Sequence, residues 1–298
     1  MVDAQNVIEG FEETKPSGSE LRRFARVFLQ RRIVLFGLIV LIILIIVAIF
    51  AEVLAPYDPY VGDFTKVRIQ PDSEYLLGTD QLGRDLLSRV IFGTRTALLV
   101  GFVTTGFAAA VGIFLGLMAG YFGGIINMII MRIMDALMGF PMILLALLVA
   151  AVLGGGLQNV IIALAVALIP GYARVMHGLT LSLRENDYVM AERAMGATDI
   201  RTMARHIFPN ALAPMIVLVT MQLGGLILAE AALSFIGIGI TPPGAAWGAM
   251  AADGYRYLLS NPVLSFAPSL CIMLVAFSFQ LVGDGLRDAL DPRLRGLI

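Results

Sequence analysis

The sequence contains few of the residues that most often carry chemistry in proteins. Its 298 residues include one cysteine, Cys271, and two histidines, His177 and His206. The lone cysteine has no disulfide partner within the chain, and it lies in an apolar run, as packing cysteines do. A metal site needs several ligands together, and neither histidine has a cysteine or an acidic cluster beside it. We therefore expect no metal to be bound by this chain.

Motifs that would give the chain a reaction of its own are also missing from the sequence. It has no G-x-x-x-x-G-K-[ST] phosphate loop, and neither Lys15 nor Lys66 follows a glycine-rich turn. It also lacks H-E-x-x-H, a dinucleotide fingerprint between a strand and a helix, and a Ser/His/Asp arrangement. We predict that the chain is not an enzyme and does not itself hydrolyse ATP.

Charge is scarce and apolar residues dominate. Only 14% of the residues are charged, 58% are hydrophobic, and the mean hydropathy is +0.86. These values lie far outside the range of soluble proteins. The chain is therefore predicted to be a polytopic membrane protein.

Apolar stretches long enough to cross a hydrocarbon core, which takes about 20 residues, recur six times. They cover residues 33–55, 94–120, the stretch after the turn at 121–127 up to about 153, then 157–176, 211–236 and 266–282. We therefore expect an all-α membrane protein with six transmembrane helices. Gly112 and Gly116 in the second span have the small-residue spacing that permits close helix contact. Pro141 lies early in the third span, and Pro170 should kink the fourth.

The distribution of basic residues orients the six spans. With both termini inside, 15 of the 21 lysines and arginines fall in cytoplasmic segments and 6 in outside segments, as the positive-inside rule requires. The expected organisation is a cytoplasmic N-terminal segment (1–32), a first transmembrane helix (33–55), an extracytoplasmic segment with a short interfacial helix (56–93), a core domain of spans 2–6 (94–287) with a cytoplasmic loop (177–210), and a cytoplasmic tail (288–298).

Two pairs of charged residues have the spacing of local ion pairs. Asp85 lies four residues before Arg89, which predicts an ion pair on the short interfacial helix. Arg132 and Asp135 are three residues apart near the start of the third span. Because unpaired charge is costly in or beside a membrane, we expect these two side chains to pair and to anchor the helix end.

Two polar residues of the fifth span are possible pathway residues. Glu230 is the only carboxylate well inside a span, and Gln222 lies eight residues before it. One acid toward the outer end of a helix is weak evidence for proton coupling, which normally needs ionisable sites near mid-membrane. We favour the interpretation of Glu230 as a helix-end residue that faces protein or water.

One polar stretch interrupts the apolar spans, from Arg184 to Asn210. It reads R-E-N-D-Y-V-M-A-E-R-A-M-G-A-T-D-I-R-T-M-A-R-H-I-F-P-N. Asn186 or Asp187 can cap a first short helix, Gly196 supplies a hinge, and Thr198 can cap a second helix that Pro209 should end.

The second helix of this stretch has two different faces. The exposed face should carry Asp199, Arg201 and Arg205, while Ile200, Met203, Ala204 and Ile207 share the other. An amphipathic helix lying in the inner membrane interface is the simple alternative. The glycine hinge favours a part inserted into the groove of a partner protein.

This stretch resembles the cytoplasmic signature of permeases from binding-protein-dependent ABC importers, which is E-A-A, three residues, G, nine residues, then I-x-L-P. Three further stretches are similar to the dipeptide/oligopeptide/nickel subfamily, in particular to the subunit called C in dipeptide systems. They are L-G-T-D-Q-L-G-R-D-L-L-S-R from Leu77, S-F-I-G-I-G-I-T-P-P-G-A-A-W-G-A-M from Ser234 and G-D-G-L-R-D-A-L-D-P-R from Gly283. The resemblance extends from about residue 30 to 295.

The chain departs from this signature at two positions. Met190-Ala191-Glu192 stands where Glu-Ala-Ala is common, so the carboxylate has moved two places, and Phe208 stands where Leu is usual. Gly196 and Pro209 match. The helices on either side of Gly196 are therefore better supported as coupling elements than the carboxylate of Glu192 is.

The resemblance implies a site at each side of the membrane. The residues assigned to ATPase coupling are Asp187, Tyr188, Met190, Ala191, Glu192, Ala194, Gly196, Ala197, Asp199 and Arg201. The extracytoplasmic motif comprises Gly78, Thr79, Asp80, Gly83, Arg84 and Asp85. The first loop and residues 241–254 would face a binding protein.

The resemblance also implies partners and a location. The complex would contain a homologous second permease subunit, two ABC ATPase subunits that hold ATP and Mg²⁺, and an extracytoplasmic substrate-binding protein. This chain would itself carry no cofactor and contact no nucleic acid. It would lie among the lipids of a bacterial or archaeal plasma membrane.

We expect the transmembrane subunit of an ATP-driven importer of dipeptides or oligopeptides, which works by alternating access. Nickel or another small solute is an alternative substrate. A stand-alone secondary transporter or channel, and a structural membrane anchor, are alternatives of other classes.

Overall fold

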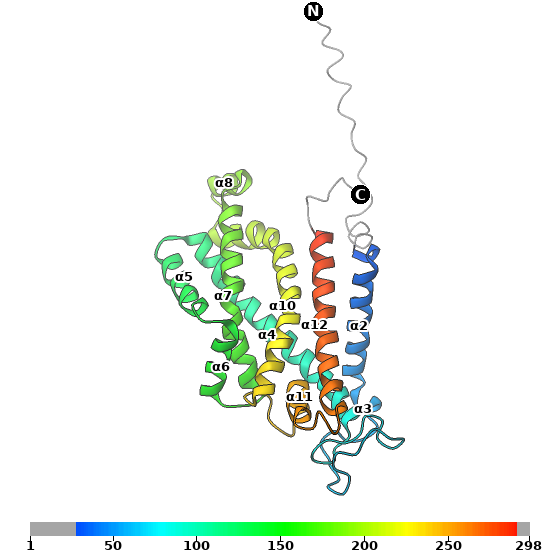
Figure 1. Ribbon diagram of the computed structural model, residues 1–298. Helices are drawn as coiled ribbons and strands as arrows, with labels where there is room; N and C mark the ends of the chain where they lie inside the picture. Colours follow the sequence, from blue (N-terminus) through cyan, green and yellow to red (C-terminus); the bar gives the residue numbers. More distant parts are fainter. Residues whose placement is uncertain (1–27, 291–298) are drawn as a thin grey trace, which may run out of the picture.

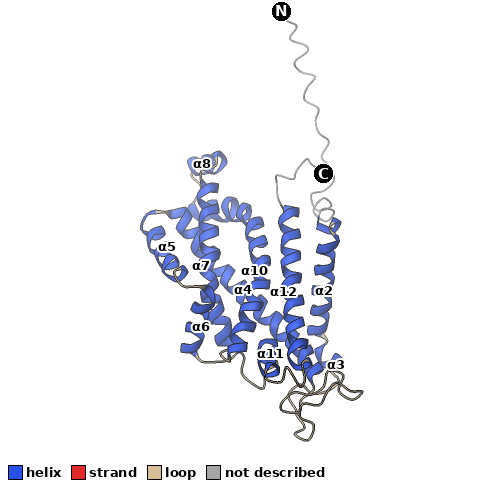
Figure 2. Cartoon of the chain, in the orientation of Figure 1, coloured by secondary structure: helices blue, strands red, loops and turns tan. Residues whose placement is uncertain are grey.

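The computed structural model describes residues 28–290, and this part of the chain is built from helices without a β-strand (Figures 1 and 2). The helices are α2 (Arg32–Ile49), α3 (Ala51–Leu54), α4 (Leu86–Phe122), α5 (Gly124–Met138), α6 (Met142–Leu153), α7 (Leu157–Arg184), α8 (Asp187–Ala194), α9 (Asp199–Thr202), the π-helix η1 (Met203–Ile207), α10 (Phe208–Ile236), α11 (Trp247–Tyr255) and α12 (Val263–Leu290). The expected N-terminal segment 1–32 and tail 288–298 lie mostly outside the described residues.

Among residues 28–290, five helical stretches are long and apolar enough to cross a membrane: α2, α4, α7, the continuous run from α9 to α10, and α12. The third expected span is different, because α5 and α6 meet at a bend of 93°. Pro141 lies at the bend, as the residue that precedes the first turn of α6. Proline disfavours helical backbone at the residue before it and cannot donate a hydrogen bond. The expected single helix is therefore a broken pair.

The second span begins earlier than the sequence suggested. Helix α4 is continuous over 37 residues, so the short interfacial helix expected before residue 94 is its first turns. The side chain of Asp85 caps this helix by accepting a hydrogen bond from the backbone N–H of Ser88 at 2.7 Å. A side-chain cap satisfies one of the free amides of a first turn, which explains why the helix starts here.

The fifth span is likewise longer than expected, and Pro209 does not end the helix before it. The chain runs from α9 through η1 into α10 without a break. Inside a continuous helix, proline leaves one backbone carbonyl without its usual N–H donor. The π-helix η1 directly precedes Pro209, so the hydrogen-bond pattern of the helix already changes at this point.

The long helices run between two ends of the molecule that differ in structure (Figure 1). Helix α8 projects at one end, here called the α8 end, while α3, α11 and the loop 56–85 gather at the other, the α11 end. Helix α4 runs obliquely from the α11 end to the α8 end. The start of α2 lies beside the end of α12, where Arg31 and Asp288 form an ion pair of 2.6 Å.

The centre of the bundle is the contact between α4 and α7, and it depends on glycine. A Cβ atom on Gly116 would lie 2.3 Å from the carbonyl oxygen of Ala173, and one on Gly112 would lie 2.6 Å from Cβ of Tyr172. Real Cβ atoms do not approach other atoms so closely, so only glycine permits this packing. The predicted role of the two glycines in close helix contact is confirmed.

Replacing one of these glycines should separate the two helices. We expect Gly116→Ala to destabilise the protein by about 1–3 kcal/mol, because the added methyl group meets backbone and cannot be accommodated by a side-chain movement. The measurement is the thermal unfolding midpoint of the purified protein in detergent. Gly106→Ala is the matched control, since a Cβ on Gly106 of the same helix has nothing within 4 Å. It should leave the midpoint unchanged or raise it slightly, and equal losses in both variants would contradict the packing argument.

Candidate functional site at the two polar ends

The polar stretch between α7 and α10 forms two short helices at the α8 end, joined by a turn at Gly196. Gly196 has a φ of +88°, and two backbone hydrogen bonds close the turn, from Gly196 N to Arg193 O at 3.0 Å and from Ala197 N to Glu192 O at 3.2 Å. This pair of bonds defines a Schellman motif, whose left-handed residue is usually glycine. The glycine hinge is therefore a conformational requirement of the turn.

The two predicted helix caps differ in outcome. Thr198 caps α9 and accepts from the backbone N–H of Arg201 at 3.4 Å. Asn186 stands at the cap position of α8, but its side chain accepts no capping hydrogen bond, and Asp187 is the first residue of the helix. The starts of both helices were thus predicted correctly, and the side-chain bond was predicted correctly at Thr198 only.

The stretch exposes large apolar side chains. Met195 is 80% exposed and Ile200 is 76% exposed, and Tyr188 and Met190 are also exposed. Side chains of this kind on a protruding element are typical of a surface that contacts another protein.

The two expected faces of the second helix are present. Asp199, Arg201 and Arg205 are exposed, while Ile200, Met203 and Ala204 line one open apolar groove against α4. Ile207 is buried in the same cluster as Met203 and Tyr121.

Tyr121, in the last turn of α4, fastens this stretch to the bundle. Its hydroxyl donates to Oδ1 of Asp199 at 2.7 Å, and the guanidinium of Arg193 lies 5.6 Å from the ring centroid. The ring also packs against Met203 and Ile207. Sequence reasoning missed Tyr121, because its partner Asp199 is 78 residues away and no local pattern marks the contact.

The carboxylate of Glu192 points inward, toward the second helical piece. Oε1 lies 3.3 Å from Nε of Arg201, and Oε2 lies 3.2 Å from Nε2 of His206. The side chain is only 18% exposed. Asp187, Ala191, Ala194 and Asp199 are exposed and Ala197 is half-buried, so the structure brings the ten predicted coupling residues into one protruding element.

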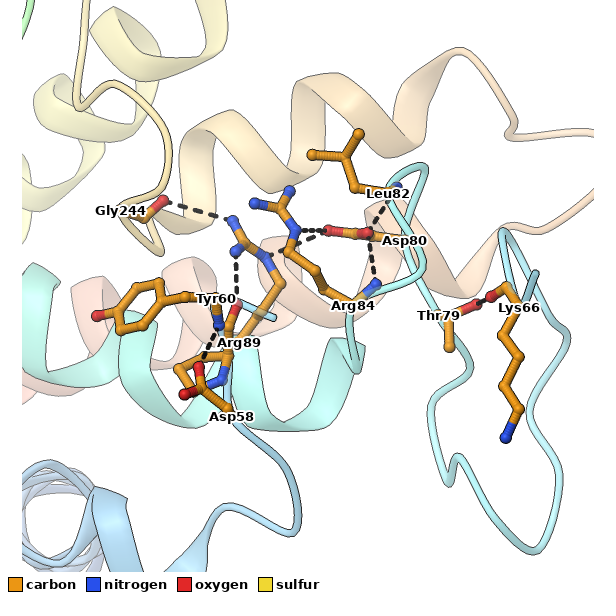
Figure 3. A network of polar contacts seen from close by, with 10 residues as sticks. Asp58, Tyr60, Lys66, Thr79, Asp80, Leu82, Arg84, Arg89 and Gly244 are labelled. Atoms are coloured by element: carbon orange, nitrogen blue, oxygen red, sulfur yellow. Dashed lines mark hydrogen bonds and ion pairs between the residues drawn. The ribbon is translucent and has the colours of Figure 1, made fainter. Parts of the chain in front are cut away.

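At the α11 end the predicted motif surrounds a buried charge network (Figure 3). Oδ2 of Asp80 lies 2.7 Å from Nε of Arg84 and 3.4 Å from Nε of Arg89, and all three side chains are buried. Arg89 also donates to the carbonyl oxygens of Pro59 at 2.9 Å and Gly244 at 3.4 Å. The network therefore joins the first loop, α4 and the loop before α11.

The expected pair of Asp85 with Arg89 is wrong. Asp85 instead binds the backbone N–H and the hydroxyl of Ser88, at 2.7 and 2.6 Å. As the helix cap it lies outside the helix, so the spacing rule for residues on one helix face does not apply to it. Arg89 is bound by Asp80, which lies in the preceding turn.

The remaining motif residues shape the loop that carries this network. Gly78 and Gly83 have φ values of +78° and +71°, as expected for tight turns. The hydroxyl of Thr79 accepts from the backbone N–H of Ile69 at 2.9 Å. The same loop reaches the link between α11 and α12, where the Gln70 side chain donates to the carbonyl oxygen of Ser260 at 2.5 Å. The loop 56–85, which includes the motif, and residues 241–261 therefore form one unit, hereafter the cap.

Two expectations concern charges within the bundle. The expected Arg132–Asp135 pair is wrong, because Asp135 of α5 forms its ion pair with Arg174 of α7 while Arg132 is exposed. Glu230 is 3% exposed, and its carboxylate accepts from the hydroxyl of Ser234 at 2.6 Å. The carboxylate of Glu230 therefore faces protein, and its role in a pathway stays a prediction. Gln222 is half-buried on the same helix.

Comparison with known proteins identifies relatives over almost the whole chain. The model of the family "Binding-protein-dependent transport system inner membrane component" matches residues 112–296, and that of the "N-terminal TM domain of oligopeptide transport permease C" matches residues 19–74.

Individual relatives cover the chain even more completely. The glutathione transport system permease protein GsiD of Pectobacterium atrosepticum is 41% identical over 92% of this chain and 91% of its own length. The dipeptide transport system permease protein DppC of Alkalihalophilus pseudofirmus is 41% identical over 89% of this chain and 88% of its own. A putative peptide transport system permease protein of Brucella suis is 43% identical over 91% of both.

A solved structure shares the fold. A chain of the MetNI methionine ABC transporter in an inward-facing conformation superposes with a TM-score of 0.56 at 22% identity, over 69% of this chain and 98% of that one. With a family model that covers more than half of the residues and relatives above 40% identity along most of its length, the chain belongs to the inner-membrane permeases of binding-protein-dependent transport systems.

Proposed function

We propose that this chain is the membrane-embedded permease subunit of an ATP-driven importer of short peptides. The observation that carries the proposal is the stretch 187–207, an element that projects from the bundle and exposes Met195 and Ile200. A chain with no phosphate loop needs such an element to receive work from a separate ATPase. The relatives named for dipeptide, peptide and glutathione transport support short peptides as the substrate class.

In this proposal the α8 end is cytoplasmic and α8 and α9 sit in the groove of an ATPase subunit. The Schellman turn at Gly196 sets the angle between the two helices, and Tyr121 connects them to α4. Closure of the ATPase pair on ATP would move this element as a body and pull on α4 and α10. The permease itself catalyses nothing and supplies alternating access.

The cap would face an extracytoplasmic binding protein on the opposite side of the membrane. Its surface exposes apolar side chains, including Phe64 and Leu259, over a frame fixed by the Asp80 network. A fixed frame favours docking, because loops that buried ion pairs already hold in place lose little conformational entropy on binding. Substrate choice would lie mostly in that binding protein.

The complete transporter would contain a second, homologous permease and two ATPase subunits that bind ATP and Mg²⁺. It would reside in a bacterial or archaeal plasma membrane, with both ends of the chain in the cytoplasm. The ion pair between Arg31 and Asp288 supports this topology, because it places the start of α2 and the end of α12 at the α8 end.

Transport should require every part of this assembly. In proteoliposomes that hold the complete importer, we expect peptide uptake to need both ATP and the binding protein, since the chain has no motor of its own. The measurement is uptake of a labelled dipeptide with either component omitted. A proton gradient in place of ATP is the control, and uptake that persists with the gradient and without ATPase subunits would instead indicate a secondary transporter.

The hinge gives a sharper test at one residue. Gly196→Val should lower peptide uptake per ATP hydrolysed at least several-fold, because a β-branched residue at positive φ costs about 1–2 kcal/mol and distorts the turn. Gly196→Asn is the matched control, since asparagine adopts the left-handed conformation more readily. The ratio of uptake to hydrolysis is the readout, with membrane insertion checked separately. Normal coupling in Gly196→Val would mean that the turn does not transmit the motion.

A further inference from the structure

The link between α9 and α10 is a π-helix, and its geometry is unusual for a continuous transmembrane helix. Residues 203–207 form η1, and the backbone N–H of Phe208 bonds to the carbonyl oxygen of Met203. π-turns inside α-helices are rare and are frequent at functional sites. Such a turn persists only where the surrounding contacts stabilise it, so the question is which contacts hold η1.

Arg201 precedes this turn, His206 lies within it, and both side chains point toward Glu192. They are five residues apart, which is about 1.4 turns of an α-helix and would direct the two side chains to different faces. In a π-helix the hydrogen bond itself joins residues i and i+5, so residues at this spacing come nearer to one face. The distances of 3.3 and 3.2 Å from the two oxygens of one carboxylate show that both side chains do meet there.

A second contact connects the same elements. The side-chain amide of Asn210 donates to the carbonyl oxygen of His206 at 2.6 Å and lies 3.4 Å from the hydroxyl of Tyr188. Asn210 belongs to α10 and Tyr188 to α8. Helix α8 is therefore attached at two places, to α9 and η1 through Glu192 and to the start of α10 through Tyr188.

We propose that Glu192 is a positioning residue that holds η1 in its π-helical form, so that α8, α9 and the start of α10 move as one body. The inference rests on the proposed function of this stretch in coupling, and it assigns the displaced carboxylate a role within the chain. Without the carboxylate, the side chains of Arg201 and His206 lose their common partner, and the turn can relax toward α-helical geometry. A change in hydrogen-bond register at η1 rotates α10 relative to α8, so force applied to α8 is no longer transmitted to α10.

The test compares Glu192→Gln with Glu185→Gln in the complete importer in lipid nanodiscs. Glu185 is the matched control, because its exposed carboxylate pairs with the adjacent Arg184 and, among residues 28–290, with no other basic side chain. Hydrogen exchange of the amides of residues 203–208 reports on η1 directly. We expect about tenfold faster exchange in Glu192→Gln, as loss of a pair worth about 1.4 kcal/mol would give, and no change in Glu185→Gln. Peptide uptake per ATP hydrolysed should fall several-fold in Glu192→Gln alone.

A double variant separates this role from a direct contact with the ATPase. Met190→Glu/Glu192→Ala moves the carboxylate to the position usual in the family, on the exposed side of α8. We expect the backbone amides of residues 203–208 to exchange as fast in the double variant as in Glu192→Gln. Restored protection or coupling in the double variant would overturn the proposal, and so would exchange in Glu192→Gln equal to that of the control. If the wild-type complex shows no ATP-driven uptake, the proposed function fails. Faster exchange at residues 203–208 in Glu192→Gln would still establish that Glu192 holds η1 in its π-helical form.

Discussion

The close approach of α4 to α7 is the constraint on which the rest of the structure depends. Gly112 and Gly116 bring the two backbones into contact, and Gly120 continues the contact toward the α8 end. There Arg184 of α7 donates to the carbonyl oxygen of Gly120 at 2.9 Å, and Tyr121 is presented to α9. A wider spacing would move Tyr121 away from Asp199, so the position of the protruding element follows from helix packing within the bundle.

The same helix connects the two polar ends. Helix α4 starts at the buried charge network of the cap and ends at Tyr121, and 37 residues at about 1.5 Å each give a rod of about 55 Å. Trp247 of α11 adds to its attachment at the cap by donating to the carbonyl oxygen of Val90 at 2.9 Å. A continuous helix fixed at both ends moves as a whole. On the proposed function, it therefore offers a direct mechanical connection between ATPase and binding protein.

The sequence predicted what depends on local pattern and missed what depends on distant partners. Apolar length located the spans, small-residue spacing located the α4–α7 contact, and Gly196 located the hinge, because each is a property of neighbouring residues. The Arg132–Asp135 pair was assigned wrongly for the opposite reason, because Asp135 pairs with Arg174, 39 residues away, and local spacing carries no information about such a pair. The Asp85–Arg89 pair was wrong for a local reason, because Asp85 is the helix cap. The bend of 93° at Pro141 was also within reach of local reasoning. On our proposal, the π-turn at η1 instead depends on contacts between separate helices.

The displacement of one carboxylate by two positions changes which partner it can reach. Two residues correspond to about 200° around an α-helix, so positions 190 and 192 of α8 face in nearly opposite directions. Met190 is exposed, and Glu192 is turned toward Arg201 and His206. On the proposed function, the ATPase groove would contact the thioether of Met190 at the position where the family signature has a glutamate. An apolar side chain in the partner groove would suit that contact better than a basic one, because a cation buried against Met190 would have no counter-charge.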